Sequence, residues 1–339
     1  MAEQSSDVKN SDNSAGGHKL GLISLIAIVV SSMLGGGVFS LPQNTAASSA
    51  LGPVIIAWII AGIGIYFIAN SFRVLSDLRP DLQAGVYMYA QEGFGSFIGF
   101  NVAWGYWLMT AFGNVAFAVI LMDAFNQFMP GVFTDGNNLN SIICGSVLIW
   151  GYNFLVLSGT KVAGFVNTLG TIAKLVPLIL FVLLLGVLID YSDLFKNFWG
   201  ESPAILSGNG NDAAPVSLLS QILAPMTVTL WAFIGVEGAV VLSGRAKNKQ
   251  DVGKATLIGF LLALIIYMLM SILPFGVMPQ AELAQVSNPS TAGVLAHVVG
   301  QWGDWLMSAG LIISVLAVTI SLLGIFLLLY EMYQVAREY

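Results

Sequence analysis

Long apolar stretches separated by short polar loops run along almost the whole chain. A stretch of about 18 or more apolar residues is long enough to cross the hydrocarbon core of a bilayer as a helix. A short helix at the membrane surface is expected over residues 288–300. The pattern predicts an all-α integral membrane protein with eight spans, near residues 20–43, 51–73, 95–128, 140–158, 163–189, 215–243, 255–277 and 303–330.

Glycines interrupt two of these spans where a spanning helix would be continuous. The first span contains Ser-Ser-Met-Leu-Gly-Gly-Gly at residues 31–37, and the sixth contains Trp-Ala-Phe-Ile-Gly-Val-Glu-Gly at residues 231–238. Unpaired backbone groups cost several kcal/mol each in lipid, so unwound backbone persists only beside protein or a water-filled cavity. Two interrupted spans in corresponding positions of two repeats are typical of a transporter's substrate site.

The composition excludes a soluble domain. Of the 339 residues, 57% are hydrophobic and 9% are charged, whereas an average soluble domain has about 25% charged residues. The single cysteine, Cys144, lies in an apolar stretch, and His18 and His297 are the two histidines. Neither a disulfide framework nor a cysteine or histidine metal site is therefore expected, and we predict no cofactor. Nucleic acid is not expected as a partner.

The polar residues 1–17 are expected to form a disordered cytoplasmic tail and residues 18–339 a single transmembrane domain. No cleavable signal peptide precedes the first span, which is therefore expected to remain in the mature protein.

The basic residues predict the orientation. If the N-terminus is cytoplasmic, most of the 12 lysines and arginines face the cytoplasm, Lys196 lies outside and Lys174 lies within a span. The cytoplasmic set is Lys9, Lys19, Arg73, Arg79, Lys161, Arg245, Lys247, Lys249, Lys254 and Arg337. We therefore expect a multi-pass membrane protein with both termini inside the cell.

Ionisable side chains within the predicted spans are candidates for function. Glu237 follows the interruption of the sixth span, and its carboxyl group could take up and release a proton; the alternative is an acid that extends toward the cytoplasmic surface. Lys174 lies in the middle of the fifth span, too deep to reach the surface easily. Its buried ammonium group requires carbonyl oxygens or a carboxylate, and an unwound helix end supplies carbonyls; the alternative is an inert lysine in a hydrated crevice.

Backbone amides at Gly36 and Gly37 could bind a carboxylate, because they lie beside the positive end of a half-helix. The alternative is that these glycines permit close helix packing. Trp231 could close over a bound ligand. Motifs of metalloproteases, serine hydrolases and P-loop nucleotidases are absent from the sequence, as are the repeated filters of ion channels, so we predict a transporter and not an enzyme.

Several motifs of the sequence are specific enough to compare with known families. They are Leu20-Gly21-Leu22-Ile23, Ser32 to Phe39, Gly85-Val86-Tyr87-Met88-Tyr89, Gly93-Phe94-Gly95, Tyr106-Trp107, Gly113-Asn114, Lys174-Leu175-Val176-Pro177, Leu230 to Glu237, Arg245-Ala246 and Asp251 to Thr256. These motifs resemble those of the amino acid–polyamine–organocation (APC) transporters, and among them the basic amino acid/polyamine antiporters. The resemblance extends over about residues 18–320 and is nearest to the arginine/ornithine exchangers.

The resemblance implies a fold of two inverted repeats of five helices, with the first repeat at about 18–190 and a partial second repeat at about 215–339. It implies that the amides of Gly36 and Gly37 bind the substrate carboxylate, and that the carbonyls of Met33, Trp231 and Ile234 accept the α-ammonium group. Trp231 would also be the outer aromatic gate. The side-chain pocket would be lined by Ser32, Met109, Thr110 and Asn114.

The resemblance also assigns Glu237 to gating and proton sensing, and Lys174 to the position that holds an ion in sodium-coupled relatives. Gly36 stands where some relatives have a hydroxyl residue. Leu322 stands where relatives have a tryptophan that stacks on the substrate, and Phe326 lies nearby. Relatives of this kind have twelve spans, so the predicted second repeat is incomplete.

The expected function is exchange of a cationic, arginine-like amino acid for a related, ornithine-like product by alternating access. Two alternatives are a proton-coupled amino acid symporter and a truncated membrane protein without transport activity. The expected partners are small amino acids and the lipid bilayer, with a second copy of the chain as a further candidate.

Overall fold

The computed structural model describes residues 20–79, 81–82, 86–157, 160–200, 217–241, 243 and 246–316, and the side chains among them outside 155–173. Within these residues the structure is helical, with one isolated bridge between Leu20 and Ala246. The predicted tail, Leu322 and Phe326 lie outside the described residues.

In the first half of the chain, helices form in the first five predicted spans, and three short elements that were not predicted lie between or after those spans. The elements of this half are α1 (Leu22–Met33), η2 (Gly36–Ser40), α2 (Leu41–Ser48), α3 (Leu51–Leu78), α4 (Val86–Phe94), α5 (Ser96–Asn126), η3 (Thr134–Gly136), α6 (Leu139–Leu157), α7 (Thr160–Leu188) and α8 (Tyr191–Leu194).

The second half is divided into shorter helices around the sixth span. Its elements are α9 (Leu218–Leu223), α10 (Met226–Ala232), α11 (Gly238–Val241), α12 (Gln250–Ile272), η6 (Leu273–Gly276), α13 (Gln280–Leu283) and α14 (Ser290–Val299), followed by a helix over residues 301–316. The helix expected at 288–300 is α14.

Three described helices are long and apolar enough to cross a membrane: α3, α5 and the segment Gln250–Gly276. The pair Leu22–Met33 and Gly36–Ser48, bent by 51°, would be a fourth span. The other four predicted spans lie partly outside the described residues or side chains. The count of eight, the orientation and the repeats therefore stay predictions.

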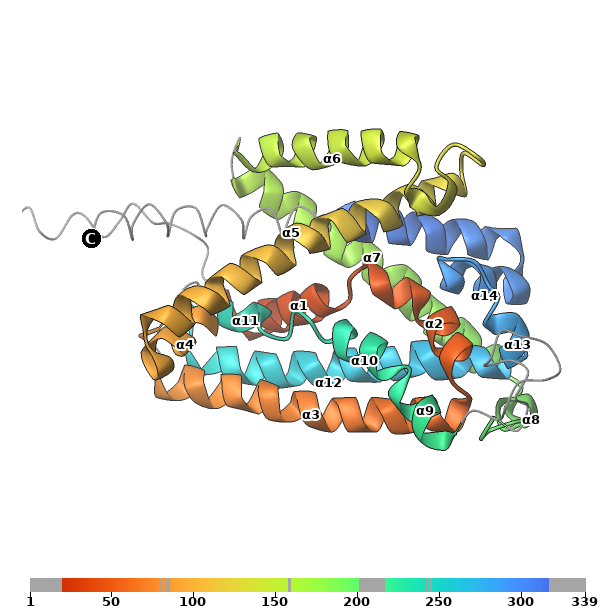
Figure 1. The fold of residues 1–339 in the computed structure, drawn as a ribbon, viewed down its shortest axis with the longest axis horizontal. Coiled ribbons are helices and arrows are strands. Elements are labelled where there is room, and N and C mark those ends of the chain that lie inside the picture. Colours follow the sequence, from red (N-terminus) through yellow and green to blue (C-terminus); the bar gives the residue numbers. More distant parts are fainter. Residues whose placement is uncertain are drawn as a thin grey trace, which may run out of the picture.

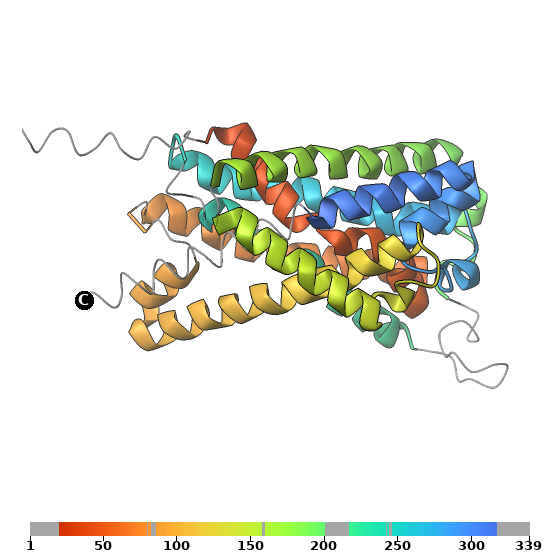
Figure 2. The same ribbon diagram turned by 90° about the horizontal axis from the view of Figure 1, so that it is seen from above.

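Helices α3 and α12 lie side by side along one face of the molecule, and α1 packs against α12 (Figure 1). A Cβ atom on Gly259 of α12 would lie 2.6 Å from Cγ1 of Val29 in α1, so glycine at this position permits the close approach of the two helices. On the other side of the molecule, the helix of residues 301–316 lies along α7 (Figure 2), where Gly310 meets Pro177.

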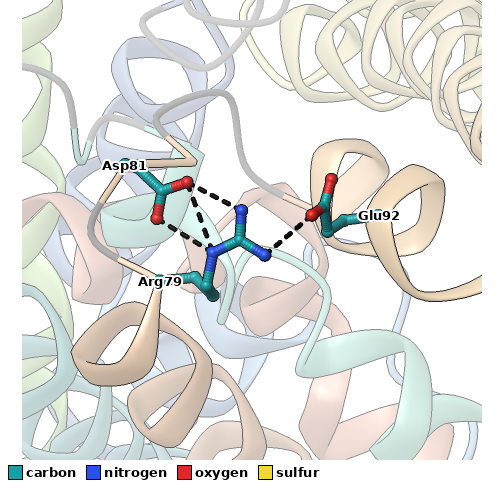
Figure 3. A network of polar contacts seen from close by, with 3 residues as sticks. All are labelled: Arg79, Asp81 and Glu92. Atoms are coloured by element: carbon teal, nitrogen blue, oxygen red, sulfur yellow. Dashed lines mark hydrogen bonds and ion pairs between the residues drawn. The ribbon is translucent and has the colours of Figure 1, made fainter.

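An exposed ion-pair network closes the end of α3 (Figure 3). Nη2 of Arg79 lies 2.7 Å from Oδ2 of Asp81, and its Nη1 lies 2.9 Å from Oε1 of Glu92 in α4. The hydrogen bonds from Arg79 lower the pKa of Asp81 below its usual value. The network joins the end of α3 to α4, and because exposed ion pairs contribute little to stability, we expect it to have little effect on the stability of the fold.

Candidate functional site

The first interrupted span breaks between Met33 and Gly36. The N–H of Leu34 still donates to the carbonyl of Val30 at 2.9 Å, but the N–H of Gly35 turns to the carbonyl of Met33 at 2.7 Å. In a continuous helix that amide would donate to the carbonyl of Ser31, four residues earlier. The break therefore frees carbonyl groups at the end of α1 for other donors.

The chain resumes beyond the break as η2 and continues without interruption into α2. The N–H groups of Gly36 and Gly37 are the first two of this helical segment, where an amide has no partner within its own helix. Neither donates to another described residue. The structure thus presents two adjacent free amides at a helix N-terminus, the arrangement required of a carboxylate site.

The second interrupted span breaks between Ala232 and Gly238, where residues 233–237 form turns. Gly235 has a φ of 106°, which a glycine adopts readily and an L side chain rarely does. A Cβ atom on Gly235 would lie 2.7 Å from the carbonyl carbon of Ser32, and one on Gly238 would lie 2.9 Å from its Oγ. The two breaks, about 200 residues apart in sequence, are therefore in direct backbone contact.

Trp231 belongs to the second interrupted span and packs against the first break. A Cβ atom on Gly37 would overlap the six-membered ring of Trp231. Trp231 is 44% exposed. The space next to Gly37 is thus occupied by an aromatic ring that is itself accessible.

Lys174 of α7 is fully buried, and its Nζ donates to the carbonyl of Ser31 at 2.5 Å. The sequence predicted that a carbonyl of an unwound helix would accept from Lys174. Ser31 is available because the amide of Gly35 turns to Met33, which removes the helical donor of Ser31. Among the described residues, no carboxylate lies within ion-pair distance of Lys174.

Glu237 turns back toward the second break. Its Oε2 accepts from the N–H of Gly235 at 3.0 Å, and its Oε1 accepts from the hydroxyl of Tyr106 in α5 at 3.2 Å. In this conformation Glu237 therefore does not extend toward the membrane surface, which was the alternative. The carboxyl group instead joins the break to α5.

One face of α5 carries the predicted pocket residues Thr110 and Asn114 together with Phe117, spaced as neighbours along a helix. Phe117 contacts the first break, since its Cζ lies 3.3 Å from the position of a Cβ on Gly35. Thr110 and Asn114 are buried. The Oδ1 atom of Asn114 is buried without a hydrogen-bond partner among the described residues, which leaves it free to accept from a ligand.

The remaining predicted residues differ in exposure. Ser32 and Ile234 are exposed, and Met109 is half-buried. The carbonyl of Trp231 accepts from the N–H of Ile234 at 3.2 Å. An open cavity of about 630 Å³ lies elsewhere, between the ends of α3 and α12 beside Arg73 and Lys254. At the breaks, the backbones of the two spans are in contact in this conformation.

Two tyrosines that we did not predict as site residues also contact the breaks. Tyr106 binds Glu237, and the hydroxyl of Tyr267 in α12 lies 2.5 Å from the carbonyl oxygen of Met33 and 2.7 Å from that of Ala232. One sequence feature could have drawn attention to Tyr267: it is the single residue with a hydroxyl group in the apolar run 257–270. A tyrosine in such a run usually has a hydrogen-bond partner, but the pattern does not say which.

The relatives of this chain are amino acid transporters by name. Arginine/agmatine antiporters of Chlamydia abortus and Chlamydia trachomatis are each 52% identical to it, over 309 and 297 residues. One of Chlamydia pneumoniae is 53% identical over 300 residues. These matches cover 88–91% of this chain and 60–62% of each relative. The chain thus spans about three-fifths of the length of these relatives.

The model of the amino acid permease family matches residues 20–338. A permease is a transporter, so this match confirms the prediction that the chain is not an enzyme. Together with the names of the relatives, it also confirms the predicted resemblance to basic amino acid antiporters. The chain is a membrane protein that belongs to the amino acid permease family.

Proposed function

We propose that this chain binds a cationic, arginine-like amino acid between the two breaks and exchanges it for a related product by alternating access. The observation that carries the proposal is the backbone contact of Gly235 with Ser32, because it brings free amides and freed carbonyls to one place. A zwitterion needs donors for its carboxylate and acceptors for its ammonium group, and this place supplies both.

In this proposal Gly36 and Gly37 bind the carboxylate, and the carbonyls of Met33, Trp231 and Ile234 bind the α-ammonium group. Ser32, Met109, Thr110 and Asn114 line the side-chain pocket. The unpaired Oδ1 of Asn114 supports this assignment, because a guanidinium group carries donors and no acceptor. Trp231 is the outer gate over the amides.

Glu237 and Lys174 carry the conformational change in this proposal. The hydrogen bond from Tyr106 to Glu237 closes the second break against α5, and Lys174 holds the end of α1 against α7. Loss of either contact would free one helix from its neighbour, which shifts the balance between conformations. We place the chain in a bacterial plasma membrane with both termini cytoplasmic, surrounded by lipid and with a homodimer as a candidate assembly.

The exchanged product is either ornithine-like, as the sequence resemblance implies, or agmatine, as the relatives' names suggest. An exchange experiment distinguishes the two products and also tests the alternative of a proton-coupled symporter. Proteoliposomes that contain the 339-residue chain should take up labelled arginine when loaded with the true product, without a proton gradient. Uptake only with a proton gradient would favour the symporter, and arginine binding without uptake would favour the inactive alternative.

Replacing Trp231 by leucine should weaken the binding of arginine more than that of citrulline, which has the same length and no charge. The face of an indole attracts a cation by about 0.5–2 kcal/mol, whereas loss of packing would affect both ligands alike. Competition binding measures, for arginine and for citrulline, the affinity of the variant relative to that of the unaltered chain. Trp302→Leu is the control at an exposed tryptophan. Equal losses for both ligands would show that Trp231 packs and does not recognise charge.

A further inference from the structure

Tyr267 occupies a position that joins the two broken spans. Its side chain is 1% exposed. Its ring stacks on Trp58 of α3, with ring centres 5.6 Å apart and planes inclined by 19°, and meets the edge of Phe233 at 5.7 Å. Because Phe233 lies within the second break, the ring of Tyr267 is held between α3 and this break. The hydroxyl group therefore has little freedom to choose other partners.

The hydroxyl lies between the ends of two helices. Met33 is the last residue of α1 and Ala232 the last residue of α10, and the hydroxyl oxygen lies 2.5 Å and 2.7 Å from their carbonyl oxygens. The helical donor of Ala232 would be the N–H of Val236, which instead donates to Phe233 at 3.2 Å. Each break thus leaves one carbonyl that the same hydroxyl reaches.

A tyrosine hydroxyl has one proton, so it can donate to one of the two carbonyls at a time. The Met33 carbonyl has two lone pairs, and the N–H of Gly35 occupies one at 2.7 Å. When the hydroxyl donates to Met33, both lone pairs are in use. An ammonium group can bind Met33 when the hydroxyl turns its proton to Ala232, which keeps both carbonyls satisfied.

We propose that Tyr267 is a positioning residue that joins the carbonyl ends of both broken helices through one shared proton and sets where the α-ammonium group of the substrate binds. The proposal rests on the proposed function for its substrate. The contact of the hydroxyl with the carbonyls of both breaks, here called the tie, does not require a substrate. The proposal predicts that Tyr267 acts on the ammonium end of the ligand and not on the carboxylate or side-chain ends.

The first test needs no ligand. Tyr267→Phe keeps the ring and its stacking on Trp58 but removes the hydroxyl. Hydrogen exchange of the amides in residues 33–37 and 232–236 should accelerate at least tenfold relative to the unaltered chain, with no change in residues 290–299 of α14. Unchanged exchange at both breaks would overturn the tie.

The second test measures recognition of the ammonium group. Arginine affinity should fall at least fivefold in Tyr267→Phe, whereas 5-guanidinopentanoate, which lacks the α-ammonium group, should bind as before. Trp58→Phe, which disturbs the stack and keeps the hydroxyl, should not produce this selectivity. An equal change for both ligands, or tighter arginine binding, would overturn the proposal. Absence of arginine binding to the unaltered chain would refute the proposed function, while hydrogen exchange would still decide the tie.

Discussion

Replacing Gly37 by valine is expected to lower arginine affinity at least tenfold, about 1.4 kcal/mol. Two effects act together. The side chain covers the free amides of the helix start, and its Cβ displaces the ring of Trp231 that already lies against Gly37. Equilibrium binding of labelled arginine to the purified chain measures the loss. Gly64→Val is the matched control, because a Cβ at Gly64 meets nothing within 4 Å.

A second comparison separates the two effects of the Gly37 substitution. In a Trp231→Ala background there is no ring to displace, so a remaining loss reports on the amides. Agmatine lacks the carboxylate, and its affinity should therefore fall less than that of arginine in this background. If Gly37→Val leaves arginine binding intact in a folded protein, the carboxylate site lies elsewhere.

Replacing Lys174 by alanine is expected to slow exchange at least tenfold while changing arginine affinity less than threefold. The ammonium group donates to the carbonyl of Ser31, and none of the described hydrogen bonds joins it to the proposed ligand groups Gly36 or Gly37. Its removal frees α1 from α7 and leaves the binding groups in place. Initial exchange rates in proteoliposomes and equilibrium binding in detergent give the two quantities.

Lys174→Met separates the charge from the volume of this side chain. Methionine fills much of the same buried space without an amine, so a loss of packing would be repaired and a loss of the hydrogen bond would not. We therefore expect Lys174→Met to exchange as slowly as Lys174→Ala. Exchange at the rate of the unaltered chain in either variant would exclude Lys174 from the conformational change.

The hydrophobic pattern predicted the long helices, and the glycines within apolar stretches predicted both breaks, because glycine has a strong local effect on the backbone. The short helix α4 was not predicted. Helices α3, α5 and α6 begin and end within a few residues of the predicted spans, except that α3 continues five residues past 73 to Leu78. Helix α12 begins at Gln250, whereas the predicted span begins at 255. The prediction was late because the first residues of the helix include Asp251 and Lys254 and lack the apolar signal.

The contacts between distant segments could not be predicted from spacing alone. That Gly235 touches Ser32 depends on how α1 and α10 cross, which no local pattern encodes. That Ser31 is the acceptor of Lys174 depends on the single amide of Gly35 turning to Met33. Tyr267 was missed because its role comes from two carbonyls about 200 residues apart in the sequence.

The central claim is that the ligand binds where the two breaks meet, and cysteine protection tests it most directly. The chain has one cysteine, Cys144, so a Cys144→Ser background permits single reporters at the exposed positions Ser32 and Ile234. Asn137→Cys, in an exposed loop before α6, is the control. Saturating arginine should slow maleimide labelling of Ser32→Cys and Ile234→Cys at least fivefold and leave Asn137→Cys unchanged. Undiminished labelling at both breaks under conditions where arginine binds would contradict the account.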